Sequence, residues 1–134
     1  MQLNLNCVRD TLMTIEEWSA LNDDLEFVDI YLENICKSSK MLKYTKPDIA
    51  YTILILKEAG FISAAIDHSS DGMDILYISR LTYSGHLFLD TIRPQAFWEK
   101  IHSIADKTGL KSLSVIMEIA DLLLPDTLKS ALHS

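Results

Sequence analysis

The stretch TKPDIAYTILILKEAGFISAAIDHSSDGMDILYISR, residues 45–80, decides the fold of this chain. Its first part carries the signals of a helix start. Thr45 can accept a hydrogen bond from the first turn, and Pro47 suits that turn because its missing N–H costs nothing there. Gly60 ends the helix, since glycine reaches a positive φ without penalty. The pattern predicts a helix over Pro47–Ala59.

A β-hairpin is predicted directly after this helix, from Phe61 to Arg80. Its first strand shows the alternation of a half-buried strand at Ile62, Ala64 and Ile66. The pair Asp71-Gly72, preceded by two serines, is typical of a tight hairpin turn, and Ile75–Ser79 returns as the second strand. A helix, a glycine stop and a two-stranded ribbon in this order predict a winged helix-turn-helix.

The region before this stretch contains one clear helix and one ambiguous segment. The helix runs from about Cys7 to Trp18, with Asn4 or Asn6 as its cap and with Trp18 closing the core near its end. Its buried face is made by Leu5, Val8, Leu12 and Ile15. Residues 23–44 support either a helix or a strand. The helical spacing there is that of Leu25, Val28, Leu32 and Ile35, whereas FVDIYL is rich in strand-forming residues.

Helices are also predicted after the hairpin. Thr82 caps one over Tyr83–Arg93, and Pro94 begins the next segment. The two remaining helices are defined by their apolar residues, which are Phe97, Trp98, Ile101 and Ala105 for the first, ending near Gly109, and Leu113, Ile116, Met117, Ala120, Leu123 and Leu124 for the second. Pro125 is expected to break the second, and Thr127–Leu132 can add a final turn.

These elements predict an α+β fold that is mostly helical, a winged helix-turn-helix with a two- or three-stranded wing followed by C-terminal helices. Residues 1–93 form the winged-helix part. Residues 94–134 form a helical extension that is expected to pack on the same core, so that the chain is one domain overall. A length of 134 residues fits a single core.

Composition narrows the classes of function. The hydrophobic share of 49% and the charged share of 23% are ordinary for a globular protein. No apolar run approaches the length of a membrane span, and MQLNLNCVRD lacks the pattern of a secretory signal. Cys7 and Cys36 form no CxxC pair, so we expect two reduced thiols in a cytoplasmic protein.

No motif points to catalysis. None of the four histidines stands at metal-ligand spacing, and no phosphate-binding or nucleophile motif is present. His86 and Asp90 are four residues apart and can touch, which more often gives a structural hydrogen bond than a general base. Asp67, Asp71 and Asp74 do not have the spacing of a calcium loop. The sequence therefore predicts a non-enzymatic protein without a metal or cofactor.

The residues on the central helix decide between DNA and protein as the partner. The face turned away from Ile49, Ile53 and Leu56 carries Asp48, Tyr51, Leu54, Ile55 and Glu58. Base edges are read by basic and amide side chains, which this face lacks. Possible nucleic-acid contacts are Lys40, Lys43, Lys46, Lys57 and Arg80, but the formal net charge is −7. The face suits a protein partner, or the C-terminal helices of the same chain cover it.

Three segments together resemble an uncharacterised bacterial and phage family, domain-of-unknown-function family 2513. They are DIAYTILILKEAGFI (48–62), LTYSGHLFLDTIR (81–93) and FWEKI (97–101), and the opening LNLNCVRDTL is also similar. The resemblance implies a winged-helix-like part, a helical C-terminal part and no assigned activity. It suggests a small, prophage-associated accessory or regulatory role. The chain departs from the family at Thr52 and Leu54, which is expected to make the outward helix face more apolar.

We therefore expect a regulatory protein that acts through protein–protein contact or as a homodimer, with no membrane role. The alternative is a DNA-binding transcriptional regulator of phage or mobile-element type.

Overall fold

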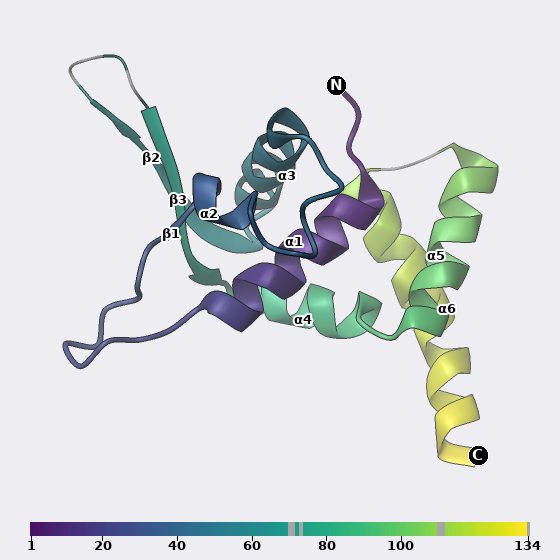
Figure 1. The fold of residues 1–134 in the computed structure, drawn as a ribbon. Helices are drawn as coiled ribbons and strands as arrows, with labels where there is room; N and C mark the ends of the chain where they lie inside the picture. The colour runs from purple at the N-terminus through teal and green to yellow at the C-terminus, as the bar shows by residue number, and fades with distance from the viewer. Residues whose placement is uncertain (70–71, 73, 110–111, 134) are drawn as a thin grey trace. The chain divides into compact units, whose positions relative to one another are not determined.

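The computed structural model describes residues 1–69, 72, 74–109 and 112–133, with the backbone alone for 125–133 (Figure 1). The chain divides into two compact units, Met1–His86 and Leu87–Ser134. The first unit contains, in order, α1 (Leu5–Trp18), β1 (Ile30–Tyr31), α2 (Leu32–Ile35), α3 (Lys46–Glu58), β2 (Ile62–His68) and β3 (Asp74–Leu81). The prediction that the C-terminal helices share the core of the first unit stays a prediction.

The three strands form one antiparallel sheet in the order β1-β3-β2. The short strand β1 pairs through Ile30 and Tyr31 with β3, and β2 and β3 form the hairpin. In Figure 1 this hairpin extends beyond α1, α2 and α3, as a wing does. Three helices, a small sheet and this connectivity confirm the α+β, winged helix-turn-helix prediction.

The central helix α3 starts and ends as its sequence predicts. The Thr45 hydroxyl accepts a hydrogen bond from the Asp48 N–H at 3.3 Å, which fixes the first turn. At the other end Gly60 has a φ of 80°, and the N–H groups of Gly60 and Phe61 donate to Lys57 and Leu56 at 3.0 Å. These two bonds make a Schellman motif, so the chain turns directly from α3 into β2.

The core of the first unit lies between α1, α3 and the sheet. It is built from side chains that are at most 5% exposed, among them Leu5, Val8, Leu12, Ile15, Ile49, Ile53, Leu56, Ile62, Ile78 and Leu81. Asn4, rather than Asn6, caps α1 by accepting from the Cys7 N–H at 3.2 Å. Trp18 was expected to close the core near the end of α1. Its side chain is only half-buried, so this expectation is partly met.

A β-bulge keeps the apolar residues of the hairpin on one face. The register changes between Ser63 and Ala64, which pair with Arg80 and Ile78, so that Ser79 has no partner in β2. Without the bulge, strict alternation would turn Leu81 to the face opposite Ile78, three residues earlier. With it, both are buried. The predicted turn falls partly on Ser70 and Asp71, which lie outside the described residues.

Residues 23–44 contain both of the structures that the sequence left open. Strand β1 and the one-turn helix α2 follow each other directly. The helical stripe, however, does not extend to its first two members, because Leu25 and Val28 are 81% and 49% exposed in a loop before β1. Leu25 has a φ of 63°, which no helix contains. The helical spacing of Leu25 and Val28 therefore does not correspond to a helix.

The helix α4 (Tyr83–Ile92) begins against the end of α3. As predicted, Thr82 caps it, accepting from the Gly85 N–H at 3.1 Å and donating its hydroxyl proton to the Gly60 carbonyl at 2.6 Å. The Thr82 N–H also donates to the Phe61 carbonyl. A Cβ on Gly85 would lie 1.9 Å from that same Phe61 oxygen, so the close approach requires glycine here.

The second unit contains α5 (Gln95–Thr108) and α6 (Leu113–His133), which pack on each other. The predicted apolar face of α5 is buried, and the helix ends at Gly109. On α6, Ile119 is buried although the sequence did not single it out, and Met117 is 39% exposed. The predicted break at Pro125 is wrong, because α6 continues to His133. An interior proline costs about 3 kcal/mol in a helix, which weakens the helix without forbidding it.

Candidate interaction surfaces

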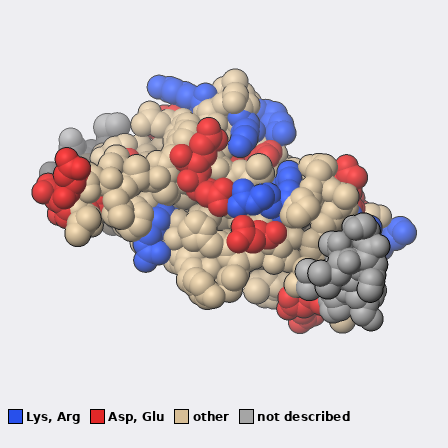
Figure 2. Space-filling view, turned by 90° about the horizontal axis from the view of Figure 1, so that it is seen from below, with Lys and Arg blue, Asp and Glu red and all other residues tan. Residues whose placement is uncertain are grey.

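Three lysines that could contact phosphates are paired with acids of their own unit. Lys40 lies 3.5 Å from Glu17, and Lys43 lies 3.3 Å from Asp10, both on α1. The third, Lys46 at the start of α3, donates a hydrogen bond to Glu33 on α2. On the face seen in Figure 2, blue basic and red acidic side chains lie next to one another. The pairing cancels much of the positive potential that the lysine cluster would otherwise have.

The Lys46–Glu33 pair holds both of its groups in the charged form. The hydrogen bond and the charge of Lys46 lower the pKa of Glu33, and the same contact raises the pKa of Lys46. Both side chains are exposed, so the pair is screened by solvent and adds little stability. Its importance is electrostatic, because a DNA phosphate would have to displace a carboxylate from Lys46.

The other two bases predicted as nucleic-acid contacts differ from each other. Arg80 on β3 lies over the ring of Phe27 at 5.6 Å and donates to the Leu81 carbonyl at 3.1 Å. Its guanidinium is thus engaged by its own chain. Lys57, near the end of α3, is exposed, and it forms no ion pair with the residues that the structure describes.

The outward side of α3 is only partly open. Asp48, Tyr51, Leu54 and Ile55 are half-buried, and Glu58 is exposed. Thr52 was expected to contribute to this side but is 1% exposed, and its hydroxyl donates to the Asp48 carbonyl at 2.8 Å. The assignment of the five outward residues to an interaction face stays a prediction, and Thr52 belongs to the core.

The loop between α1 and β1 is a candidate surface that the sequence did not reveal. Asn22 organises it: its side-chain oxygen accepts from the N–H groups of Asp24 and Glu26, both at 3.0 Å, and its N–H donates to the Glu26 carbonyl. Leu21 and Phe27 bridge the two arms of the loop. This closed loop presents Leu25 to solvent at a backbone angle that leucine rarely adopts.

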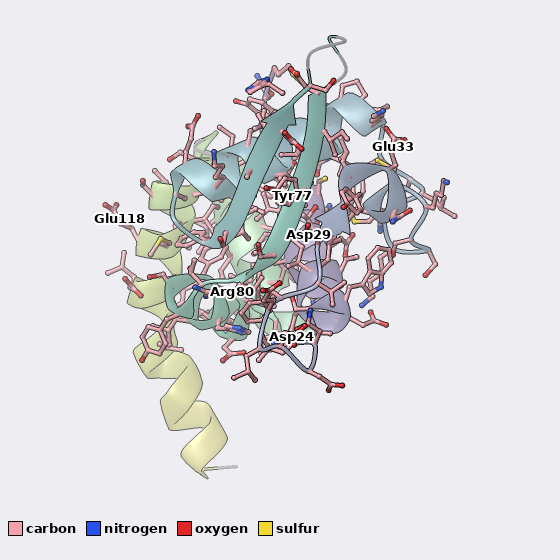
Figure 3. The ribbon with its side chains drawn as sticks, turned by 90° about the vertical axis from the view of Figure 1, so that its left-hand side faces the viewer. Asp24, Asp29, Glu33, Tyr77, Arg80 and Glu118 are labelled. Atoms are coloured by element: carbon pink, nitrogen blue, oxygen red, sulfur yellow. The ribbon has the colours of Figure 1, made fainter. Side chains whose placement is uncertain are left out.

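Apolar side chains continue from this loop onto the outer face of the sheet. Tyr31 on β1 and Tyr77 on β3 are paired partners with ring centroids 6.3 Å apart. In Figure 3 the sheet lies in front of α1, with Tyr77, Asp29, Arg80 and Asp24 following one another along the side towards the viewer. The exposed fractions of the apolar side chains are 54% for Leu21, 81% for Leu25, 38% for Phe27, 49% for Val28, 42% for Tyr31 and 45% for Ile75. We call this set, with Tyr77, the loop–sheet face.

The residues weighed for catalysis do not assemble into one site. His86 lies 3.9 Å from Glu16, and Asp90, its expected neighbour, accepts a hydrogen bond from Arg93 at 3.1 Å. On the wing, Asp74 contacts His68 at 2.9 Å. Burial raises the pKa of both cysteine thiols, which makes them poor nucleophiles at neutral pH. Among the described residues, no group of three or more acidic, histidine or cysteine side chains has the geometry of a metal site.

The second unit has a shallow hollow on α5 and α6 of about 540 Å³. It is open to solvent and is lined by Ala96, Glu99, Lys100, Ser103, Ile104 and Leu123. Glu99 accepts a hydrogen bond from Gln95 at 3.2 Å. No convergent polar group closes over this hollow in the described part of the chain, so its shape fits no particular ligand.

A search for membrane-crossing helices in the described residues finds no helix with both the length and the apolar character that a bilayer demands.

Comparison with known proteins places the chain in a family. A crystal structure of a Streptococcus transcriptional regulator is similar to 81% of this chain and 95% of its own, with 16% sequence identity and a TM-score of 0.40. Likeness at this level carries no functional argument. No curated protein matches the chain. The model of the family described as hypothetical protein, DUF2513, matches residues 2–111. The chain therefore belongs to the DUF2513 family, as its sequence predicts.

Proposed function

We propose that this winged helix is a non-enzymatic regulatory module that works through contact with another protein, and that it does not read DNA. The observation that carries the proposal is the pairing of Lys40, Lys43 and Lys46 with acids of the same unit. A duplex would have to compete with three carboxylates already in place. Binding to phosphates gains its free energy from releasing counterions, and a lysine already neutralised by a carboxylate releases fewer.

The charge of the whole chain supports the same proposal. The formal net charge of −7 repels a polyanion, and Arg80, the single base predicted on the wing, is held over Phe27. Apolar side chains are instead exposed together on the loop–sheet face. Contiguous exposed apolar surface is typical of protein-binding sites. The absence of a catalytic motif in the sequence and the separate contacts of His86 and Asp90 support the non-enzymatic part.

A direct test is binding to a fluorescein-labelled DNA duplex of random sequence at low salt, followed by fluorescence anisotropy. We expect no binding at micromolar protein. The informative comparison is a triple variant, Lys40→Glu, Lys43→Glu and Lys46→Glu, against a Lys107→Glu control at an exposed position of α5. Salt-sensitive binding by the wild type that the triple variant abolishes would establish DNA reading and overturn the proposal.

DNA binding remains the second candidate because one observation favours it. Lys57 is exposed on α3, the helix that enters the major groove in helix-turn-helix proteins. If this candidate is right, Lys57→Glu weakens duplex binding on its own, and the slope of log affinity against log salt falls by about 1.

The proposed protein contact includes a homodimer formed through the outward side of α3. Leu54→Glu or Ile55→Glu would then reduce the mass measured by analytical ultracentrifugation from dimer to monomer, with an unchanged far-ultraviolet circular dichroism spectrum. Asp67→Asn, at an exposed position on β2 outside this face, serves as the control. A wild type that stays monomeric at high concentration removes the homodimer from the proposal and leaves a heterologous partner.

A further inference from the structure

The exposed apolar side chains of the first unit are concentrated rather than scattered. Six of those that are more than a third exposed lie on the loop–sheet face, in two short segments around residues 21–31 and 75–77. Isolated exposed apolar residues need no explanation, whereas a contiguous group rimmed by polar residues marks a binding surface. The α1–β1 loop and the sheet contribute jointly, so that the surface depends on the fold.

The rim of this surface is mainly acidic, with Arg80 lying over the Phe27 ring within it. Asp23, Asp24, Glu26 and Asp29 surround the loop, and no lysine or arginine occurs between Ser19 and Cys36. In the part of the chain that the structure describes, none of these four carboxylates forms an ion pair. The contrast with Asp10, Glu17 and Glu33 is direct, because those acids each hold a lysine. Four carboxylates that hold no lysine therefore lie beside the apolar side chains of this face.

The loop is also held in one shape before any partner arrives. The two bonds to the Asn22 side chain, the Asn22–Glu26 backbone bond and a bond from the Val28 N–H to the Ala20 carbonyl at 2.9 Å close it. A surface that is already ordered pays little conformational entropy on binding. The aromatic rings of Tyr31 and Tyr77 can in addition accept a guanidinium or ammonium over their faces.

We propose that the loop–sheet face binds a segment of a partner protein in which lysine and arginine flank apolar anchors. The apolar anchors contact Leu25, Phe27 and the tyrosine pair, and the basic groups face the carboxylates of the rim. A second copy of this chain does not fit, because it would bring like charge against the same rim. This inference rests on the proposed protein-contact function and names the chemistry of the partner.

The probe is a synthetic peptide with two leucines flanked on each side by two arginines, compared with the same peptide carrying glutamates. Each is titrated into the ¹⁵N-labelled full chain at physiological salt, and amide shifts are followed by NMR. We expect the arginine peptide to shift residues 21–31 and 75–80. We expect the glutamate peptide to leave the spectrum unchanged.

Matched variants separate local recognition from net charge. The double variant Asp24→Asn, Asp29→Asn removes two charges from the rim and keeps the backbone bonds of the loop. The control Glu118→Gln, Asp121→Asn removes two charges from exposed positions elsewhere. We expect at least a fivefold weaker affinity for the first and less than a twofold change for the second. Leu25→Gly tests the apolar part and is expected to weaken binding at least threefold.

The proposal is overturned if both double variants weaken binding equally, if the shifts map to another surface, or if the glutamate peptide binds as well. Shifts on the loop–sheet face that depend on protein concentration without peptide would assign the surface to a second copy and would overturn it too. Failure here is distinct from failure of the proposed function, because DNA binding is measured independently with the lysine variants.

Discussion

At the scale of single residues, Leu25 combines two unfavourable features. Its φ of 63° places a branched apolar side chain in the left-handed region, and 81% of that side chain is exposed. A non-glycine residue in this region costs about 1–2 kcal/mol. The side chain is therefore held where the folded state alone gains nothing from it, which is the pattern of a residue that serves a partner.

The strain predicts that Leu25→Gly stabilises the isolated protein. Glycine removes the penalty of the left-handed backbone, which raises the free energy of unfolding. Its greater freedom in the unfolded chain offsets part of this gain. We expect a net rise of about 0.5–1 kcal/mol in the free energy of unfolding. Urea denaturation followed by circular dichroism measures the change. Leu25→Ala is the control, because it shortens the side chain and keeps the Cβ, and it should gain little. A destabilised glycine variant would show that Leu25 contributes to the fold.

The environment of Tyr44 leads us to expect that the folded protein loses stability at alkaline pH. Its hydroxyl donates to Asp10 at 2.7 Å, and Lys43 contacts the same carboxylate oxygen. Burial, reinforced by Asp10, raises the pKa of Tyr44 above its ordinary value of 10.0. Because the folded pKa is the higher one, this contribution to stability is complete below pH 10.0 and falls as the pH rises beyond it.

The expected result is that Tyr44→Phe costs about 1–2 kcal/mol at neutral pH, since a hydrogen bond to a charged acceptor is lost. Between neutral pH and alkali, the variant should lose less stability than the wild type. Thermal unfolding across this pH range measures both effects, with the exposed Tyr83→Phe as control. Equal alkaline losses in wild type and Tyr44→Phe would show that other groups dominate.

At the scale of elements, the predictable parts are those whose signals are local. α3 could be placed to within a residue because Thr45 and Gly60 fix its ends by contacts a few residues away. The α1–β1 loop could not, since Leu25 and Val28 have helical spacing but the Asn22 bonds impose another backbone. Nor could the ion pairs of the lysines be predicted from the sequence. Lys43, for example, contacts Asp10 on α1, which lies more than thirty residues earlier in the chain. The candidate contacts stay a prediction, and the acids that pair with the lysines became apparent only with the fold.

The junction of α3, β2 and α4 gives a prediction about two glycines. Gly85 has no room for a Cβ beside the Phe61 carbonyl, whereas a Cβ on Gly60 would meet open space and only the positive φ opposes it. We expect Gly85→Ala to destabilise by about 3 kcal/mol, because backbone must move, and Gly60→Ala by about 1 kcal/mol. Paired denaturation curves compare them. The reverse order would mean that α4 can shift away from Phe61 at little cost.

At the scale of the whole molecule, the open matter is whether the units Met1–His86 and Leu87–Ser134 unfold together. The sequence predicts one shared core, and a shared core melts in a single cooperative transition. Ile53 in the first unit and Ile101 in the second are both 0% exposed, so Ile→Val at either site removes one buried methylene. We expect each change to lower the same single transition by about 2–6 °C.

Differential scanning calorimetry distinguishes the two arrangements, because it also compares the calorimetric with the van't Hoff enthalpy. Equal enthalpies and one peak that moves in both variants support a single core. Two peaks, of which Ile53→Val moves one and Ile101→Val the other, would show that the winged helix and the C-terminal helices are independent. In that case the loop–sheet face belongs to a self-sufficient binding module, and α5 and α6 are free to serve another contact.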